Sequence, residues 1–210
     1  MTSIELPNSV TNIDQDAFME CYNLESINIP TGVTHIGSRA FSSCHKLELP
    51  DIPGTVEEIG PYTFYHCDYS RLSAINIPDG VKRIYNSAFA AKKDAPSSVT
   101  SITIPNSVTD IYGGGAFRGG GACSGHNNVN TIVLGKGLKV LEDAFDVAPN
   151  VDLNVYCLAT TPPKGSSGFP YRSNVTVYIP KGSKDSYEAK DSDWIGCNFV
   201  ELDEEDFPAN

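Results

Sequence analysis

The sequence lacks long apolar runs, and it is poor in basic residues. No apolar stretch approaches the roughly 20 residues that a membrane-spanning helix needs, so we expect no membrane insertion of this chain. Lys and Arg number 15 against 26 Asp and Glu, which leaves a formal net charge of −11. Nucleic acids and anionic membrane surfaces attract basic faces, so this balance argues against both as partners.

A secretory leader is also missing from the start of the chain. The first basic residue is Arg39, and a strand-like apolar pattern begins at Ile4, so the Lys- or Arg-bearing beginning of a signal peptide is absent. We expect that a leader, together with earlier repeats, was removed from a longer exported protein. The alternative is a naturally short chain with a frayed first turn.

Motifs of catalytic and metal sites are absent as well. The sequence has no Gly-x-Ser-x-Gly, no His-Glu-x-x-His and no Cys-x-x-Cys. Cys44-His45 and His66-Cys67 carry metal-ligand residue types, but their histidines fall at different repeat positions. The glycine-rich stretch 113–121 lacks the Gly-Lys-Ser/Thr of a phosphate-binding loop, which favours a surface insertion. We therefore predict no catalytic residues, no metal and no cofactor, and an enzyme is the least favoured function.

What the chain does contain is a repeated unit, of which residues 24–44 are the clearest copy. Its apolar residues form two short clusters, with Pro30 after the first and Gly37 after the second. This spacing fits neither a helix nor one long strand. It predicts a short strand, a corner at Pro30, a second extended piece over 33–36 and a compact turn closed by Phe41.

The same unit recurs along the chain. The Ile-x-Ile-Pro or Ile-x-Leu-Pro strand and corner appear at residues 4–7, 27–30, 75–78 and 102–105. The closing phenylalanines are Phe18, Phe41, Phe64, Phe89, Phe117 and Phe145. Their spacing is 23 residues twice and then 25, 28 and 28. A unit of this size needs a copy above and below to bury its apolar side chains, so the repetition predicts a solenoid.

The pattern LxxIxIPxxVTxIGxxAFxxC resembles the BspA-like (treponemal-type) leucine-rich repeat family, whose repeat is 23 residues long. Residues 159–163 (ATTPP), residues 177–183 (VYIPKGS) and Trp194 resemble the closing segment of such proteins from anaerobic gut and oral bacteria. The resemblance implies a β-rich leucine-rich-repeat solenoid. Its features would be a right-handed coil, a parallel sheet on one face, almost no helix and a C-terminal cap.

The resemblance also bears on location and function. Members of this family are mostly exported or cell-surface proteins, and some are implicated in adhesion. It therefore implies an extracellular or cell-surface location, and it supplies no catalytic residues. We interpret the chain as a non-catalytic binding module that recognises a protein or a glycan, and we expect a monomer. The alternative is a structural spacer or spectator module within a longer surface protein.

Domain organisation follows from the repeat. Residues 1–150 are predicted to form a solenoid of about six turns, and residues 151–210 a capping segment of the same domain. The cap is expected to hold a final strand over 175–179, one short helix over 184–190 with Ser183 as its N-cap, and a solvated tail over 202–210. Trp194 and Phe199 would cover the last open edge.

Two further features concern the interior. Pro50 replaces a strand isoleucine in the third turn, and because proline cannot donate a ladder hydrogen bond we expect weak pairing there. Cys21, Cys44 and Cys67 each lie three residues after a closing phenylalanine, which predicts a ladder of buried, reduced thiols. Cys123 lies in an insertion. The states of Cys123, Cys157 and Cys197 are left open.

Two surfaces are candidates for ligand binding. In the first strand of each turn the residues between the apolar ones point outward. From this row we name Asn28, Asp51, Asn76 and Thr103 as ligand-binding residues. The other candidate is the set of insertions around Lys92, Lys93 and residues 119–126. We favour the sheet face because it is rigid and preorganised.

Overall fold

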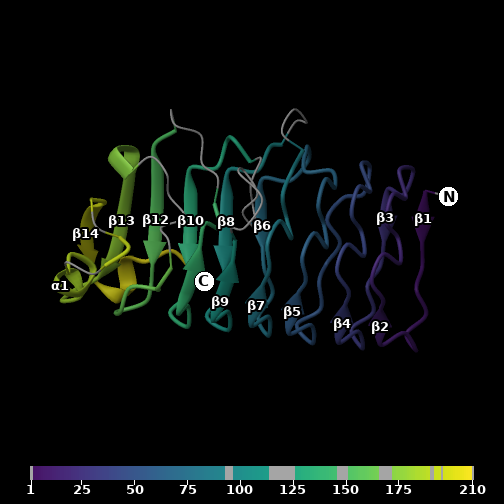
Figure 1. Cartoon of the computed structure of the whole chain (residues 1–210), viewed down its shortest axis with the longest axis horizontal. Helices are drawn as coiled ribbons and strands as arrows, with labels where there is room; N and C mark the ends of the chain where they lie inside the picture. Colours follow the sequence, from purple (N-terminus) through teal and green to yellow (C-terminus); the bar gives the residue numbers. More distant parts are fainter. Residues whose placement is uncertain are drawn as a thin grey trace.

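The computed structural model describes residues 2–92, 97–113, 126–145, 151–165, 172–189, 192–194 and 196–209. These residues form a parallel β-solenoid of about seven turns with almost no helix (Figure 1). The predicted fold class is therefore confirmed. Most of the predicted insertions, including Lys93 and residues 119–125, lie outside the described residues.

Each turn contributes two short strands. The first strands are β1 (Ser3–Ile4), β3 (Ser26–Ile27), β6 (Ala74–Asn76), β8 (Ser101–Ile104) and β10 (Thr131–Leu134). The second strands are β2 (Asn12–Ile13), β4 (His35–Ile36), β5 (Glu58–Ile59), β7 (Arg83–Ile84), β9 (Asp110–Tyr112) and β11 (Val140–Glu142). The closing segment adds β12 (Leu153–Cys157), β13 (Val175–Pro180) and β14 (Asn198–Leu202).

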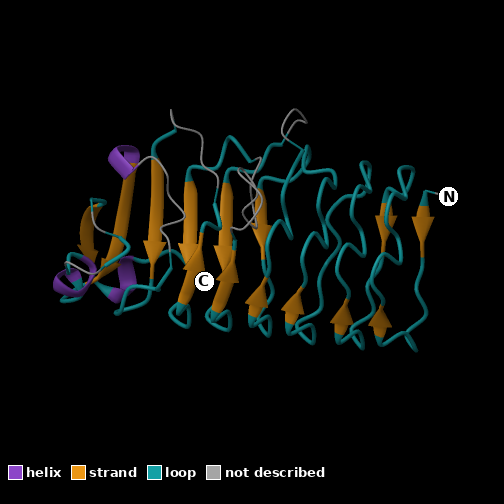
Figure 2. Ribbon diagram, in the orientation of Figure 1, coloured by secondary structure: helices purple, strands orange, loops and turns teal. Residues whose placement is uncertain are grey.

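The strands build two long parallel sheets (Figure 2). The first sheet has the order β6-β8-β10-β12-β13-β14, and β1 pairs with β3 as a separate two-stranded piece. The second sheet has the order β2-β4-β5-β7-β9-β11. The repeat pattern predicts one sheet. The second sheet arises because the extended pieces after the prolines also stack in register, with Asn12 opposite His35 and Glu58 opposite Arg83.

The third turn interrupts the first sheet. Among the described residues the third turn contributes no strand to the first sheet between β3 and β6, and a single parallel bridge joins Glu48 to Asp68. Pro50 occupies the position of a strand isoleucine in this turn, and it has no N–H to donate to a ladder. The expected weakening of the pairing is confirmed.

The closing phenylalanines form a stack along the coil. Phe18, Phe41, Phe64 and Phe89 have ring centroids 5.3 to 5.5 Å apart, and their planes lie within 18° of parallel. Backbone hydrogen bonds accompany the stack: the Phe18 N–H donates to the next turn's Ala40 carbonyl at 2.8 Å. Apolar side chains from both sheets fill the space beside the rings.

The compact turns are made by left-handed backbone at fixed positions. Asp16, Arg39, Tyr62 and Ser87 precede a closing phenylalanine by two residues, and all have φ between 55° and 59°. Glu20, Ser43 and His66 follow one by two residues, with φ between 59° and 61°. Non-glycine residues adopt this region at a cost, so neighbouring turns must hold it in place. Gly37 is required for another reason: a Cβ there would lie 2.4 Å from the Gln15 backbone nitrogen.

The closing segment continues the first sheet. The predicted strand over 175–179 is β13, and β14 pairs with it in parallel, which the sequence analysis did not foresee. The helix α1 (Lys184–Tyr187) is shorter than expected, and Ser183 does not cap it through its side chain, because its hydroxyl donates to the Pro180 carbonyl. Short 3-10 helices span Arg172–Asn174 and Glu204–Asp206.

Two aromatic residues expected to cover the end of the coil are packed there. Trp194 is buried, and its indole N–H donates to the Pro163 carbonyl oxygen at 2.9 Å. Phe199 packs partly buried against the core on β14, within 5.6 Å of the Tyr187 ring. None of the described helices is long and apolar enough to cross a membrane.

Candidate functional site

The face predicted to bind a ligand is the outer face of the first sheet, which we call the first-sheet face. Its side chains lie in rows because the strands are parallel and in register. One row begins with Asn76 on β6, opposite Thr103 on β8, and continues through Val133, Tyr156 and Tyr178. Neighbouring strands lie about 4.8 Å apart, so the row is straight and preorganised.

Only two of the four predicted binding residues lie together. Asn76 is exposed and Thr103 half-buried, and they face each other across β6 and β8. Asn28 is used inside the fold: its amide oxygen accepts from the Leu6 N–H at 2.6 Å, and its amide nitrogen donates to the Leu6 carbonyl at 3.1 Å. Asp51 is exposed in the third turn, where the sheet is interrupted.

The C-terminal part of this face is aromatic. Tyr156 on β12 and Tyr178 on β13 stack with ring centroids 4.6 Å apart and planes 11° apart. Neither tyrosine is among the four residues that the repeat pattern predicts to bind a ligand. The sequence Leu-Asn-Val-Tyr-Cys over 153–157 places Tyr156 in step with Asn154. The structure shows the matching alternation of buried and half-buried residues, so this pattern would have identified Tyr156 as outward-facing.

Residues 203–209, which we call the return segment, lie against this aromatic pair. After β14 the segment turns back toward β10 (Figure 1), and the Phe207 ring meets Tyr156 edge-on with centroids 6.5 Å apart. Lys181, after β13, binds both oxygens of Asp203 at 3.0 and 3.1 Å, and this hydrogen-bonded pair raises the pKa of Lys181. The expected solvated tail is therefore partly wrong. Leu202 belongs to β14, and Phe207 is half-buried.

A cavity of about 470 Å³ lies beside the return segment, at the carboxyl ends of β10, β12, β13 and β14. Leu158, Pro180, Leu202 and Phe207 supply its apolar lining. Its polar lining comes from Thr160, Lys136, Lys181, Asp203 and Glu204. The volume lies within the range of small-ligand pockets, and the carboxyl ends of parallel strands commonly carry ligand sites.

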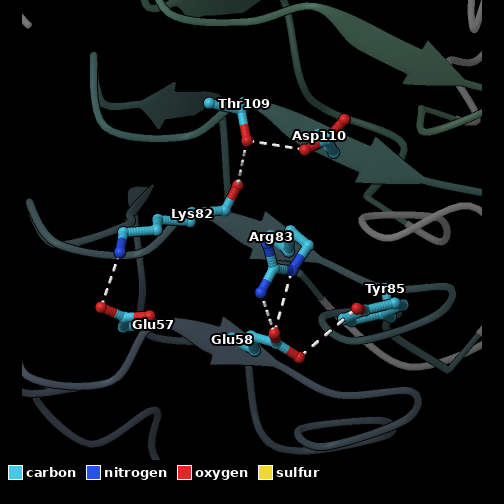
Figure 3. Close-up of polar contacts among 7 residues, drawn as sticks. All are labelled: Glu57, Glu58, Lys82, Arg83, Tyr85, Thr109 and Asp110. Atoms are coloured by element: carbon cyan, nitrogen blue, oxygen red, sulfur yellow. Dashed lines mark hydrogen bonds and ion pairs between the residues drawn. The ribbon is translucent and has the colours of Figure 1, made fainter.

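The outer face of the second sheet carries charges that pair between turns (Figure 3). Lys82 Nζ lies 2.6 Å from Glu57 Oε1, and the Arg83 Nε donates to Glu58 Oε1 at 2.9 Å. The Lys82 hydrogen bond lowers the pKa of Glu57. Tyr85 stacks on Tyr112 at 5.3 Å. These two pairs of opposite charges satisfy one another and hold successive turns in line, so Glu57, Glu58, Lys82 and Arg83 are already engaged within the fold.

One buried polar group has the elements of a catalytic pair. His126 Nε2 lies 2.9 Å from the Phe89 carbonyl oxygen, and His126 Nδ1 lies 2.8 Å from Ser97 Oγ. His126 is 1% exposed, and burial lowers its pKa to about 4. Such a weak base, closed off from solvent, is poorly suited to activate a serine. The sequence analysis placed His126 on a candidate binding surface, and its burial rules it out there.

The thiols and histidines of the second and third turns point in different directions. Cys44 and Cys67 are buried and free, and each thiol donates to a carbonyl of the preceding turn, Phe18 or Phe41, at 3.0 and 3.4 Å. Burial raises the pKa of Cys44 to about 11. His45, by contrast, is exposed. Among the described residues no group of three or more His, Cys, Asp or Glu side chains is placed to hold a metal ion.

The comparison with known proteins agrees with the repeat architecture. Residues 1–122 match the BspA type leucine rich repeat region in six copies. No curated protein matches the sequence.

Several solved structures share the fold. A leucine-rich repeat protein from Treponema pallidum is 22% identical over 92% of this chain and 86% of that chain, with a TM-score of 0.58. The pneumococcal vaccine antigen PcpA is 15% identical over 96% of this chain and 42% of that chain, with a TM-score of 0.54. A leucine-rich repeat protein from Bacteroides ovatus is 20% identical over 95% of this chain and 68% of that chain, with a TM-score of 0.48. At these identities the first two likenesses show the fold alone.

Proposed function

The chain belongs to the BspA-type leucine-rich repeat family, and from this premise we propose that it is a non-catalytic binding module of a bacterial cell-surface protein. The ligand is a protein or a glycan, bound on the first-sheet face. The family is one of bacterial surface proteins. One structural neighbour is described as a pneumococcal vaccine antigen, a description that fits display outside the cell.

The observation that carries the proposal is the register of the first sheet. Asn76 and Thr103 face each other in successive strands, and the row runs on to Tyr156 and Tyr178 without a break in pairing. Apart from the buried Val133, the row is polar and aromatic, and rigid side chains of this kind lose little conformational entropy when a ligand binds. Tyrosine supplies large contact area with few rotatable bonds and a polar end.

The test is a pair of variants screened beside the parent for binding to host matrix proteins and glycans. Asn76→Arg with Thr103→Arg places two long cations on the first-sheet face, and we expect it to abolish binding. Asn12→Arg with Thr34→Arg adds the same charge around the exposed second-sheet face and should leave binding intact. Equal loss in both variants would contradict the choice of face.

A structural spacer remains the second candidate. The side chain of Asn28 hydrogen-bonds to the backbone of the neighbouring turn. On the outer face of the second sheet, Lys82 pairs with Glu57 and Arg83 pairs with Glu58. Both features serve the fold itself. A parent protein that binds nothing across a broad protein and glycan panel would favour the spacer over the binding module.

A further inference from the structure

The return segment and the cavity beside it lie together at the C-terminal end of the first sheet. With the segment's own residues set aside, the cavity lining is Lys136, Leu158, Thr160, Pro180, Lys181 and Leu202. The only charges in that set are the two lysines. In a chain of net charge −11, a cavity whose lining outside the return segment carries only positive charges is complementary to an acidic ligand.

The chain's own segment has this complementary chemistry. Residues 203–206 are Asp-Glu-Glu-Asp, followed by Phe207. Asp203 binds Lys181, and Phe207 meets Tyr156 edge-on. The Asp203 carboxylate therefore pairs with the Lys181 ammonium group, while the Phe207 ring contacts Tyr156, one of the two half-buried tyrosines on the sheet.

The return segment is held at few points and does not fill the site. Residues 203–206 are exposed, Phe207 and Pro208 are half-buried, and about 470 Å³ remains open beside them. Exposed ion pairs and single aromatic contacts are weak. A ligand with more contacts could therefore displace the segment without disturbing the strands below it.

We propose that this end of the first-sheet face is a recognition site for an acidic peptide segment carrying an aromatic residue, and that the return segment occupies it in the free protein as a displaceable stand-in. The inference rests on the proposed function and refines it, because it names the partner class and a means of regulation. A ligand competes with the return segment, so its apparent affinity depends on how firmly that segment is held.

The probe is a labelled synthetic peptide with the sequence of residues 202–210, measured by fluorescence anisotropy. A tethered segment acts at an effective concentration on the order of 1 mM. If the peptide binds the empty site with a dissociation constant of about 100 µM, the tether weakens its apparent binding about tenfold. We therefore expect the parent to bind the peptide about tenfold more weakly than a chain whose return segment is released.

Two variants release the segment in different ways. The first is Asp203→Asn with Phe207→Ala in the full chain, and the second is a chain ending at Leu202, where β14 ends. Circular dichroism and melting confirm that each keeps the fold. In either background, Lys181→Glu should abolish peptide binding, and a peptide with Phe207→Ala should bind at least about tenfold more weakly, because each loses one of the two recognised groups.

The outcomes separate this inference from the binding proposal. No peptide binding by either folded release variant, or equal binding by the parent, overturns the inference. Binding of a sulfated oligosaccharide in place of the peptide also overturns it, since the aromatic contact would then be irrelevant. Neither result touches the Asn76 and Thr103 test. Conversely, a protein that binds the peptide but no surface ligand supports this site while contradicting the function proposed for the whole face.

Discussion

The side chain of His126 is buried, and both of its ring nitrogens have polar partners. Its Nε2 faces the Phe89 carbonyl oxygen at 2.9 Å, so the ring proton sits on Nε2 and Nδ1 accepts from the Ser97 hydroxyl at 2.8 Å. The Tyr69 ring packs edge-on against it with centroids 4.7 Å apart. Both nitrogens of the neutral ring therefore have hydrogen-bond partners. Burial lowers the pKa of His126 from 6.5 to about 4.

This burial makes stability depend on pH. The unfolded chain binds a proton at His126 at higher pH than the folded chain does, so stability is present above pH 6.5 and is lost as the pH falls toward 4. We expect His126 to contribute a loss of about 2 kcal/mol between pH 7 and pH 4.5. Urea denaturation across this range measures it.

The control for this prediction is His126→Gln. His66, whose pKa is also lowered by burial, acts in the same direction in parent and variant, so the difference between the two isolates His126. The variant is expected to be less stable at pH 7 and to lose less stability on acidification. A parallel pH profile for parent and variant would contradict the assignment.

The cysteines provide a second prediction at this scale. Cys44, Cys67 and Cys157 are buried, and burial raises their thiol pKa values, which disfavours the reactive thiolate. Cys21, which the repeat pattern predicts to be buried with Cys44 and Cys67, is only half-buried, so the predicted ladder is wrong at this position. We expect a maleimide without denaturant to label Cys21 and spare the three buried thiols, as read by peptide mass spectrometry. Labelling of Cys44 as fast as Cys21 would show that the ladder is open.

The repeat predicts burial where an apolar residue recurs at a fixed position, but it does not predict polar contacts, which depend on individual side chains. Phe41 and Phe64 recur at a fixed spacing, so their burial follows from the pattern. His126 follows an insertion, and its partner Ser97 lies 29 residues away, so no periodicity relates them. Asn28 has the right spacing for the outer face, but spacing alone does not reveal that its amide bridges to Leu6.

At the scale of one element, the compact turn depends on residues in the left-handed region. Ser43 has φ of 61°, and its N–H donates to the next turn's Tyr65 carbonyl at 2.7 Å. Such a conformation costs a residue with a Cβ about 1 kcal/mol or more, and glycine avoids this cost. The inter-turn hydrogen bonds hold the serine there.

We predict that the glycine and alanine variants rank in opposite order of stability at Ser43 and at Ser26. At Ser43, glycine should be more stabilising than alanine by about 1 kcal/mol, because only alanine carries the Cβ penalty. At Ser26, an exposed strand residue without positive φ, alanine should be the more stable by about 0.5 kcal/mol or more. Chemical denaturation of the four variants gives both comparisons. The same order at both sites would mean that Ser43 is not held in the left-handed region.

The elements also show the limit of pattern reading. The first strands and the pieces after each proline were foreseen because they repeat. The strand β14 was missed because Asn198–Leu202 carries no corner proline and follows a non-repeating segment. The proposed peptide site depends on β14, because the return segment begins where β14 ends and its Phe207 contacts Tyr156.

For the molecule as a whole, backbone pairing and ring stacking both run along the coil, and only the backbone pairing of the first sheet is interrupted in the third turn. Backbone pairing in the first sheet is interrupted at the third turn. The phenylalanine stack passes through that turn, since Phe64 lies 5.3 Å from Phe41 and 5.5 Å from Phe89. The second sheet is also continuous there. The rings and the second sheet must therefore transmit stability across the gap.

This continuity yields a prediction about cooperativity. Phe41 is fully buried between two rings, and Phe41→Ala should cost about 3–5 kcal/mol through lost burial and the cavity left behind. Repeats couple mainly to their neighbours, so hydrogen exchange should speed up first in turns one to three.

Trp194→Ala removes the buried ring that donates to Pro163 and should instead expose β12, β13 and β14. The two variants serve as each other's control, since they place similar cavities at opposite ends of one coil. If each accelerated exchange evenly along all described strands, the molecule would be unfolding as a single unit, and the nearest-neighbour account of its stability would be wrong.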